Sequence, residues 1–139
     1  MKTLTPSLRR FAIVAILLTF SFRIALSTLL WSRDYNFVMP IAILFAVLMF
    51  IAGRYYGQKD QAYLPIFDIG FRFHLVTFLQ FNLVSFAWQL FGNPSVHEPI
   101  RILYWTLTYW GLVLACHFYY YRQVKKSTIK DIHRDDLFE

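Results

Sequence analysis

Four apolar blocks alternate with short polar segments along the chain. The blocks cover residues 11–31, 37–56, 71–91 and 100–121, and each is close to the length of a membrane-spanning helix. A helix of about 20 residues, rising 1.5 Å per residue, crosses the roughly 30 Å hydrocarbon core of a bilayer. The pattern therefore predicts an all-α integral membrane protein. We expect four transmembrane helices, paired as two antiparallel hairpins in a single membrane domain over residues 1–139.

The first block does not resemble a cleaved signal peptide. Its apolar stretch follows Arg9 and Arg10, and a second apolar block begins a few residues after it ends. Signal peptides have a shorter apolar region, of about 7–15 residues, followed by a cleavage site with small residues. We therefore expect this block to be retained as the first span.

Composition agrees with a membrane protein. The chain is 58% hydrophobic, 20% aromatic and only 16% charged, whereas soluble domains are about 25% charged. The single cysteine, Cys116, cannot form a disulfide within the chain. Most of the charges flank the apolar blocks, so the net charge of +6 does not indicate a nucleic-acid partner.

The distribution of lysine and arginine predicts the orientation. Positive residues are enriched in the short cytoplasmic segments of membrane proteins. One side would carry only Arg33 and Arg101. Both termini, the middle loop and a tail over residues 122–139 should therefore be cytoplasmic. That side would hold eleven basic residues: Lys2, Arg9, Arg10, Arg54, Lys59, Arg72, Arg122, Lys125, Lys126, Lys130 and Arg134.

The third block carries a polar stripe. His74, Asn82, Ser85 and Gln89 are spaced to lie on one face of a helix. With the predicted topology, His74 and His117 both lie about 5 Å inside the cytoplasmic interface. They could hydrogen-bond to each other, share a proton, or bind a metal ion or haem. Two histidines are only half of a zinc ligand set, so no cofactor is predicted.

The fourth block has small residues on one face. Tyr104, Thr108, Gly111 and Ala115 follow helical spacing. Small residues allow the backbones of two membrane helices to approach closely. We expect the third and fourth helices to pack as an antiparallel pair through Gly111 and Ala115.

Arg23 lies about twelve residues into the first block. An arginine near mid-membrane costs at least ~2.5–3.5 kcal/mol on insertion scales unless it finds partners or water. No acidic residue is expected at its depth in the membrane. The neutral polar residues Asn82, Ser85 and Thr108 are expected at that depth instead. The side chain could snorkel, donate to this neutral group, or pair with an acid of another subunit. Arg23, Ser85 and Thr108 could also form an anion or lipid-phosphate site. We predict that the side chain points into the bundle.

Motifs for catalysis are absent from the sequence. It has no phosphate-binding glycine loop, no HExxH or CxxC motif, and no Asp or Glu within the apolar blocks. An enzyme is therefore not predicted.

Residues of the third and fourth blocks follow a characteristic spacing. They are Phe71, His74, Leu75, Phe78 and Asn82, then Trp110, Gly111, Leu114 and His117, followed by Arg122 and Lys125. With these residues the second hairpin resembles the bacterial 2TM domain, a family of two-helix membrane hairpins, over about residues 70–126. It departs from that family in having Phe78 where tyrosine is common and in the additional hairpin before it. The resemblance implies a bacterial inner-membrane location, no catalytic role, and an interhelical cluster of His74, Asn82, Trp110 and His117.

Three functions remain open from the sequence. The first is a small multi-pass protein that acts through interaction, as an accessory or assembly subunit or a membrane sensor. Its partners would be the lipid bilayer and another protein or a second copy of the chain. The second is a lipid-binding, anion-binding or transport-related protein that uses Arg23 and the polar face of the third helix. The third is a haem or metal protein that uses His74 and His117.

Overall fold

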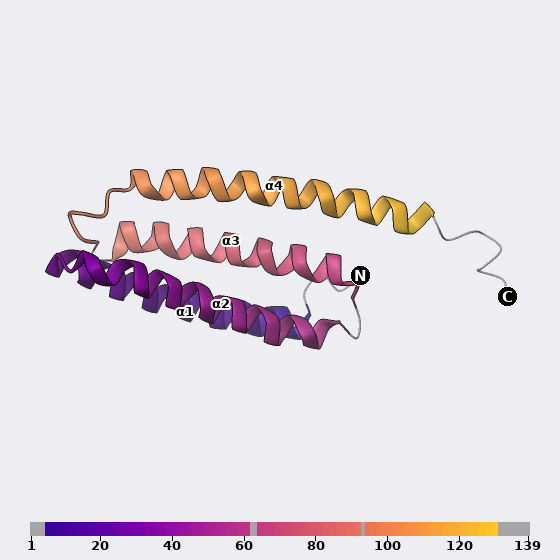
Figure 1. Ribbon diagram of the computed structural model, residues 1–139, viewed down its shortest axis with the longest axis horizontal. Coiled ribbons are helices and arrows are strands. Elements are labelled where there is room, and N and C mark those ends of the chain that lie inside the picture. Colours follow the sequence, from indigo (N-terminus) through magenta and orange to yellow (C-terminus); the bar gives the residue numbers. More distant parts are fainter. Residues whose placement is uncertain (1–4, 62–63, 93, 131–139) are drawn as a thin grey trace.

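The computed structural model describes residues 5–61, 64–92 and 94–130, with side chains up to residue 126. Over these residues the chain forms four long helices, α1 (Pro6–Ser32), α2 (Val38–Asp60), α3 (Ile66–Phe91) and α4 (Arg101–Lys130). A short 3-10 turn, η1 (Tyr35–Phe37), precedes α2. The helices run side by side along the long axis of the molecule (Figure 1). The predicted all-α class is confirmed.

Three of these helices are long and apolar enough to cross a membrane, namely Pro6–Ser32, Tyr35–Asp60 and Ile66–Phe91. The chain is therefore a candidate multi-pass membrane protein. The fourth helix is the longest, with 30 residues. It falls outside this group because tyrosine, tryptophan, threonine and histidine interrupt its aliphatic residues. The last nine residues of the predicted tail, 131–139, lie outside the described residues.

Helix α1 is central to the packing. It packs against both α2 and α3, while α4 packs against α3 alone among the described elements. Figure 1 accordingly shows α4 on the far side of α3 from α1 and α2. One row of side chains along α1 is buried, at steps of three and then four residues: Leu8, Phe11, Ala15, Thr19, Arg23 and Ser27.

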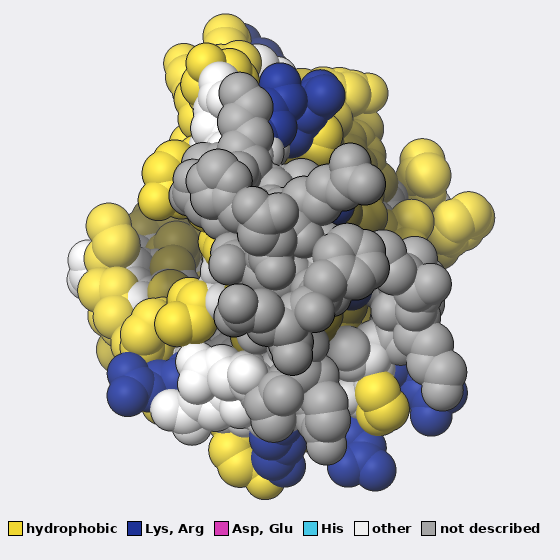
Figure 2. All heavy atoms as spheres, turned by 90° about the vertical axis from the view of Figure 1, so that its right-hand side faces the viewer, with side chains coloured by type: hydrophobic (Ala, Val, Ile, Leu, Met, Phe, Trp, Pro, Cys, Tyr) yellow, Lys and Arg dark blue, Asp and Glu magenta, His cyan; other side chains and the backbone are white. Residues whose placement is uncertain are grey.

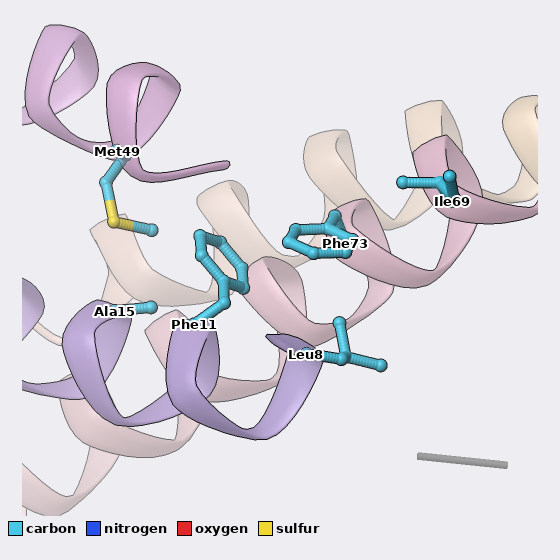
Figure 3. Packing of buried hydrophobic residues seen from close by; sticks show 6 residues of the cluster. All are labelled: Leu8, Phe11, Ala15, Met49, Ile69 and Phe73. Atoms are coloured by element: carbon cyan, nitrogen blue, oxygen red, sulfur yellow. The ribbon is translucent and has the colours of Figure 1, made fainter. Parts of the chain in front are cut away.

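The apolar core lies near the start of α1. Phe11 is 1% exposed, and its ring centre lies 4.8 Å from that of Phe73 on α3. Leu8, Ala15, Met49 and Ile69 complete the cluster (Figure 3). The cluster therefore joins α1, α2 and α3 at the end where α2 finishes and α3 begins.

A capping residue ties α1 to α2 at this end. Thr5 caps α1 by accepting a hydrogen bond from the backbone N–H of Leu8. Its hydroxyl also donates to the carboxylate of Asp60, the last residue of α2, which is buried. An acid beside a helix N-terminus is favoured by the helix dipole. The contact fixes the register of the two helices.

The face of α4 that packs on α3 differs from the expected one. Thr108 and Ala115 are exposed. Tyr104 is also exposed, but its ring centre lies 5.6 Å from that of Phe86 on α3. Gly111 lies at the margin, where an added Cβ would meet Phe78 at 3.8 Å. The prediction that small residues make this contact was wrong for Ala115. Larger side chains occupy the seam instead, at alternating steps of four and three, the spacing of coiled-coil seams. They are Leu103, Leu107, Trp110, Leu114, His117, Tyr121 and Val124.

Candidate functional site

Two hydrogen bonds between polar side chains define the register of α1 against α3. The hydroxyl of Thr19 donates to Oε1 of Gln80 at 3.0 Å, and Nε1 of Trp88 donates to the hydroxyl of Ser27 at 2.9 Å. Both pairs are 61 residues apart. The helices are therefore parallel, and Arg23, midway between Thr19 and Ser27, lies level with Val84 and Ser85 on α3.

Arg23 is paired with a buried acid. Its Nη1 lies 2.5 Å from Oε1 of Glu98, and the two residues are only 3% and 5% exposed. The other carboxylate oxygen of Glu98 accepts from the hydroxyl of Ser27 at 2.9 Å. Nε2 of Gln89 donates to the backbone carbonyl of Glu98 at 3.1 Å. The network joins α1, α3 and the segment between α3 and α4.

The expectation that no acid lies at the depth of Arg23 was therefore wrong. The segment after α3 turns inward, and both Ser95 and Glu98 are buried. A loop position at the end of a span gives no sequence signal of this depth. The only hint is the row Thr19–Arg23–Ser27, which indicates a polar seam with no assigned acid. The prediction that Arg23 points into the bundle agrees with its burial.

The proposed partners of Arg23 are placed differently from one another. Ser85 is fully buried at the level of Arg23. Thr108 is exposed and donates to the carbonyl of Tyr104 in its own helix at 2.8 Å. Asn82 likewise donates to the carbonyl of Phe78 at 2.7 Å. Of the neutral side chains expected near Arg23, Asn82 and Ser85 are buried, and Ser85 lies at the level of Arg23.

Among the described residues, Glu98 provides the ion-pair partner of the Arg23 guanidinium. Nε and Nη2 of Arg23 are buried without a protein hydrogen-bond partner among the described residues. A cavity of about 270 Å³ lies beside the pair, with Leu26, Leu30 and Ile102 among its lining residues. Because Glu98 already neutralises Arg23, this site does not present a net positive charge to an anion.

A second polar chain joins α3 to α4. Nε1 of Trp110 lies 2.7 Å from Nε2 of His74, and Nδ1 of His74 lies 2.9 Å from Nδ1 of His117. An indole N–H can only donate, so Nε2 of His74 must be an acceptor. A neutral His74 then carries its proton on Nδ1 and donates it to His117, whose own proton lies on Nε2. The contacts therefore assign both tautomers.

The geometry of the histidine pair is that of a hydrogen bond. Two nitrogens bound to one tetrahedral zinc ion at about 2.0–2.1 Å would lie about 3.3 Å apart. The observed separation is 2.9 Å, and both nitrogens of His74 are engaged. The described residues contain no group of three or more His, Cys, Asp or Glu placed to hold a metal ion.

The four residues expected to form one interhelical cluster are brought together only in part. His74, Trp110 and His117 are in contact. Asn82 is eight residues, about 12 Å, further along α3 from His74. It is buried, and its carboxamide donates to the carbonyl of Phe78 in its own helix rather than to a histidine. Gln80, Trp88 and Glu98, which the sequence did not single out as partners, provide contacts between helices instead.

Aromatic rings surround the histidine chain. Phe71 stacks on Tyr121 at 4.9 Å between ring centres, and Phe78 and Phe81 meet Trp110 at 5.8 and 5.3 Å. Burial among rings strengthens a hydrogen bond because little water competes for the donor. The seam between α3 and α4 is therefore an aromatic contact with one polar chain at its centre.

Replacing Trp110 with phenylalanine should release the tautomer of His74 while keeping an aromatic ring in the seam. Interhelical hydrogen bonds in membranes contribute about 0.6 kcal/mol on average, and up to about 1.7, so the loss of stability should be in this range. The ¹⁵N chemical shifts of His74 report the tautomer directly. Trp105→Phe, on the exposed face of α4, is the control, and an unchanged His74 spectrum in Trp110→Phe would contradict the assignment.

Comparison with known proteins finds no matching family, no similar curated protein and no similar solved structure. The likeness to the bacterial 2TM domain therefore depends on the residues quoted above alone.

Proposed function

We propose that the chain is a four-span protein of a bacterial inner membrane that acts through interaction with another protein, as an accessory or assembly subunit or a membrane sensor. The fourth span is α4. It lies along α3 (Figure 1), and its outer face exposes large side chains suited to lipid contact. These include Trp105, Tyr109, Leu112, Val113 and Tyr119.

The observation that carries the proposal is the extension of α4. The helix has 30 residues and is therefore about 45 Å long, which exceeds a hydrocarbon core of about 30 Å. Its C-terminal end projects beyond the other three helices (Figure 1). Residues 122–130, which we call the α4 extension, begin with the basic residues Arg122, Lys125 and Lys126. A helix that continues without a break from the membrane into the aqueous phase offers a rigid docking surface.

The attachment of α4 suits a sensor or an accessory subunit. Because α4 packs on α3 alone among the described elements, a change at this seam would move the extension without breaking the contacts of α1. The chain from Trp110 through His74 to His117 lies in that seam. A conformational change among the membrane helices could therefore be transmitted through this hydrogen-bonded chain to the α4 extension.

The pairing of the polar side chains supports this function over transport. Thr19 with Gln80, Arg23 with Glu98, and His74 with His117 each connect two parts of the bundle. Such pairs stabilise the helix packing, and the charge of Arg23 is neutralised within the bundle rather than left to attract an ion. The likeness to the 2TM domain, which also implies no catalysis, is part of the same proposal.

The proposal is tested by photo-crosslinking in native membranes. A photoreactive amino acid at Lys126 should give a discrete crosslinked protein product, while the same residue at Leu112, on the lipid-facing side of α4, should not. Reversing two other charges of the extension, with Arg122→Glu and Lys125→Glu, should remove the product formed from position 126. Equal crosslinking from Lys126 and Leu112, or none from either, would contradict a docking role for the extension.

Reporter fusions test the topology on which this function depends. The bias of basic residues places fusions after Gln58 and Glu139 in the cytoplasm and a fusion after Gly92 in the periplasm. A periplasmic signal at Glu139 would show that α4 does not cross the membrane as proposed.

A further inference from the structure

A groove lies between the last turns of α2 and the first turns of α3. Its volume is about 580 Å³. The residues of α2 that line it follow the spacing of a single helix face, as do those of α3. They are Phe50, Gly53, Arg54, Gly57, Gln58 and Gln61 on α2, and Ile66, Ile69, Gly70 and Phe73 on α3.

The floor of the groove belongs to the apolar core. Ile69 and Phe73 are members of the buried cluster with Phe11. Gly57 is buried, and a Cβ at this position would lie 3.5 Å from Ile69. The absence of side chains at Gly53 and Gly57 therefore deepens the groove while α2 and α3 remain in contact beneath it.

The groove changes from apolar to polar along its length. Phe50 and Phe73 line its inner part, and Arg54, Gln58 and Gln61 follow toward the end of α2. These three polar side chains are exposed. Phe50 and Gln61 are eleven positions apart, or about 16 Å along a helix. This change from apolar to polar side chains matches the structure of a lipid, which has acyl chains in the membrane and a polar headgroup at its surface.

The charge at this end is positive. Among the described residues, two acids lie at this end, Asp60 and Asp68. Both are buried, and they are engaged by Thr5 and by Arg72 at 2.7 Å, respectively. Arg54 makes no ion pair with any described residue. Figure 2 shows this end of the molecule, where Lys and Arg side chains occur at several places around the rim, with hydrophobic side chains between them.

We propose that the groove binds an acidic phospholipid of the adjacent leaflet. The phosphate lies against the guanidinium of Arg54, the carboxamides of Gln58 and Gln61 meet the glycerol and headgroup oxygens, and an acyl chain covers Phe50 and Phe73. Arginine provides paired donors that fit phosphate oxygens. The site requires the bundle to lie in a membrane, but it does not depend on a protein partner for the α4 extension.

A lipid fits this groove better than a free anion or a peptide. A free phosphate would leave the apolar inner part uncovered. In the membrane that inner part lies among acyl chains, where a polar peptide backbone would be unsatisfied. The glycines leave room for a flexible chain beside the core.

The test uses the full-length protein in nanodiscs containing equal amounts of phosphatidylglycerol and phosphatidylcholine. After extraction in mild detergent, native mass spectrometry should find phosphatidylglycerol retained preferentially by the wild-type protein. Arg54→Gln should lower its occupancy about fivefold, the effect of one basic residue near an anionic surface. Arg9→Gln, which changes an exposed basic residue of α1 at the same end of the molecule, should leave occupancy within a factor of about two.

Thermal unfolding in detergent gives the second readout. Added phosphatidylglycerol should raise the unfolding temperature of the wild type and of Arg9→Gln. It should raise the unfolding temperature of Arg54→Gln much less. Equal lipid retention by both variants would overturn the proposal, as would equal retention of the two lipids. Displacement of the bound lipid by inorganic phosphate would show that the site recognises the anion alone, which also contradicts it.

Discussion

Replacing Glu98 with alanine should destabilise the bundle by about 3–5 kcal/mol, because it leaves the guanidinium of Arg23 buried without a counter-charge. Arg23 is 3% exposed, and two of its nitrogens already have no protein partner among the described residues. The substitution also removes the acceptor of the Ser27 hydroxyl. Thermal or denaturant unfolding in detergent micelles measures the loss.

Removing both charges should restore much of the stability. A buried ion pair replaced by apolar residues of similar size is often neutral or stabilising, so Arg23→Met with Glu98→Leu should be more stable than Glu98→Ala alone. Arg101→Ala, at an exposed position at the start of α4, is the control and should change stability little. A Glu98→Ala protein as stable as the wild type would mean that Arg23 reaches water or lipid phosphate.

The second large effect is expected at Phe11. Its side chain fills the centre of the apolar cluster and is 1% exposed. Phe11→Ala should leave a cavity beside Phe73 and lower the free energy of unfolding by about 3–5 kcal/mol. The measurement is again unfolding in detergent, combined with protease sensitivity of the ends of α1, α2 and α3 that meet there.

Ile13→Ala is the matched control for Phe11→Ala. Ile13 lies two residues further along α1 and is 55% exposed, so its loss should remove contacts with lipid or detergent alone. Comparable destabilisation by both substitutions would show that the buried row of α1 is assigned to the wrong face.

The helices could be predicted because each apolar block is long and continuous. Arg23 could also be placed, since a cation with Thr19 and Ser27 at i−4 and i+4 indicates a polar face. Its partner could not, because Glu98 reaches the buried network from a turn whose path depends on the packing of α3 and α1. Depth counted along helices does not apply to such a segment.

The seam between α3 and α4 shows the opposite difficulty. Small residues at Gly111 and Ala115 suggested close packing, but several faces of α4 carry residues suited to a contact. Aromatic rings on α3, such as Phe71 and Phe78, favour the face with Trp110 and His117. The contact face of α4 depends on which side chains α3 presents to it. The pattern of α4 alone identifies the candidate faces but does not select one of them.

The polar side chains of the apolar helices are thus accounted for mainly by contacts between helices. Those on α1 meet α3 and the turn that follows it, and those on α4 meet α3. This arrangement explains why segments apolar enough to cross a membrane contain arginine, glutamine and histidine. The α4 extension and the groove beside Arg54 are the surfaces that we propose for partners.

The most direct test is the distance between the guanidinium of Arg23 and the carboxylate of Glu98 in lipid bilayers. Solid-state NMR on protein labelled with ¹⁵N in arginine and ¹³C in glutamate measures it, with Glu98→Gln used to assign the signal. The ion pair has a nitrogen–oxygen separation of 2.5 Å, so strong dipolar coupling is predicted between the Arg23 nitrogens and the Glu98 carboxylate carbon. No measurable coupling would place the two charges apart and contradict the account of the buried polar seam.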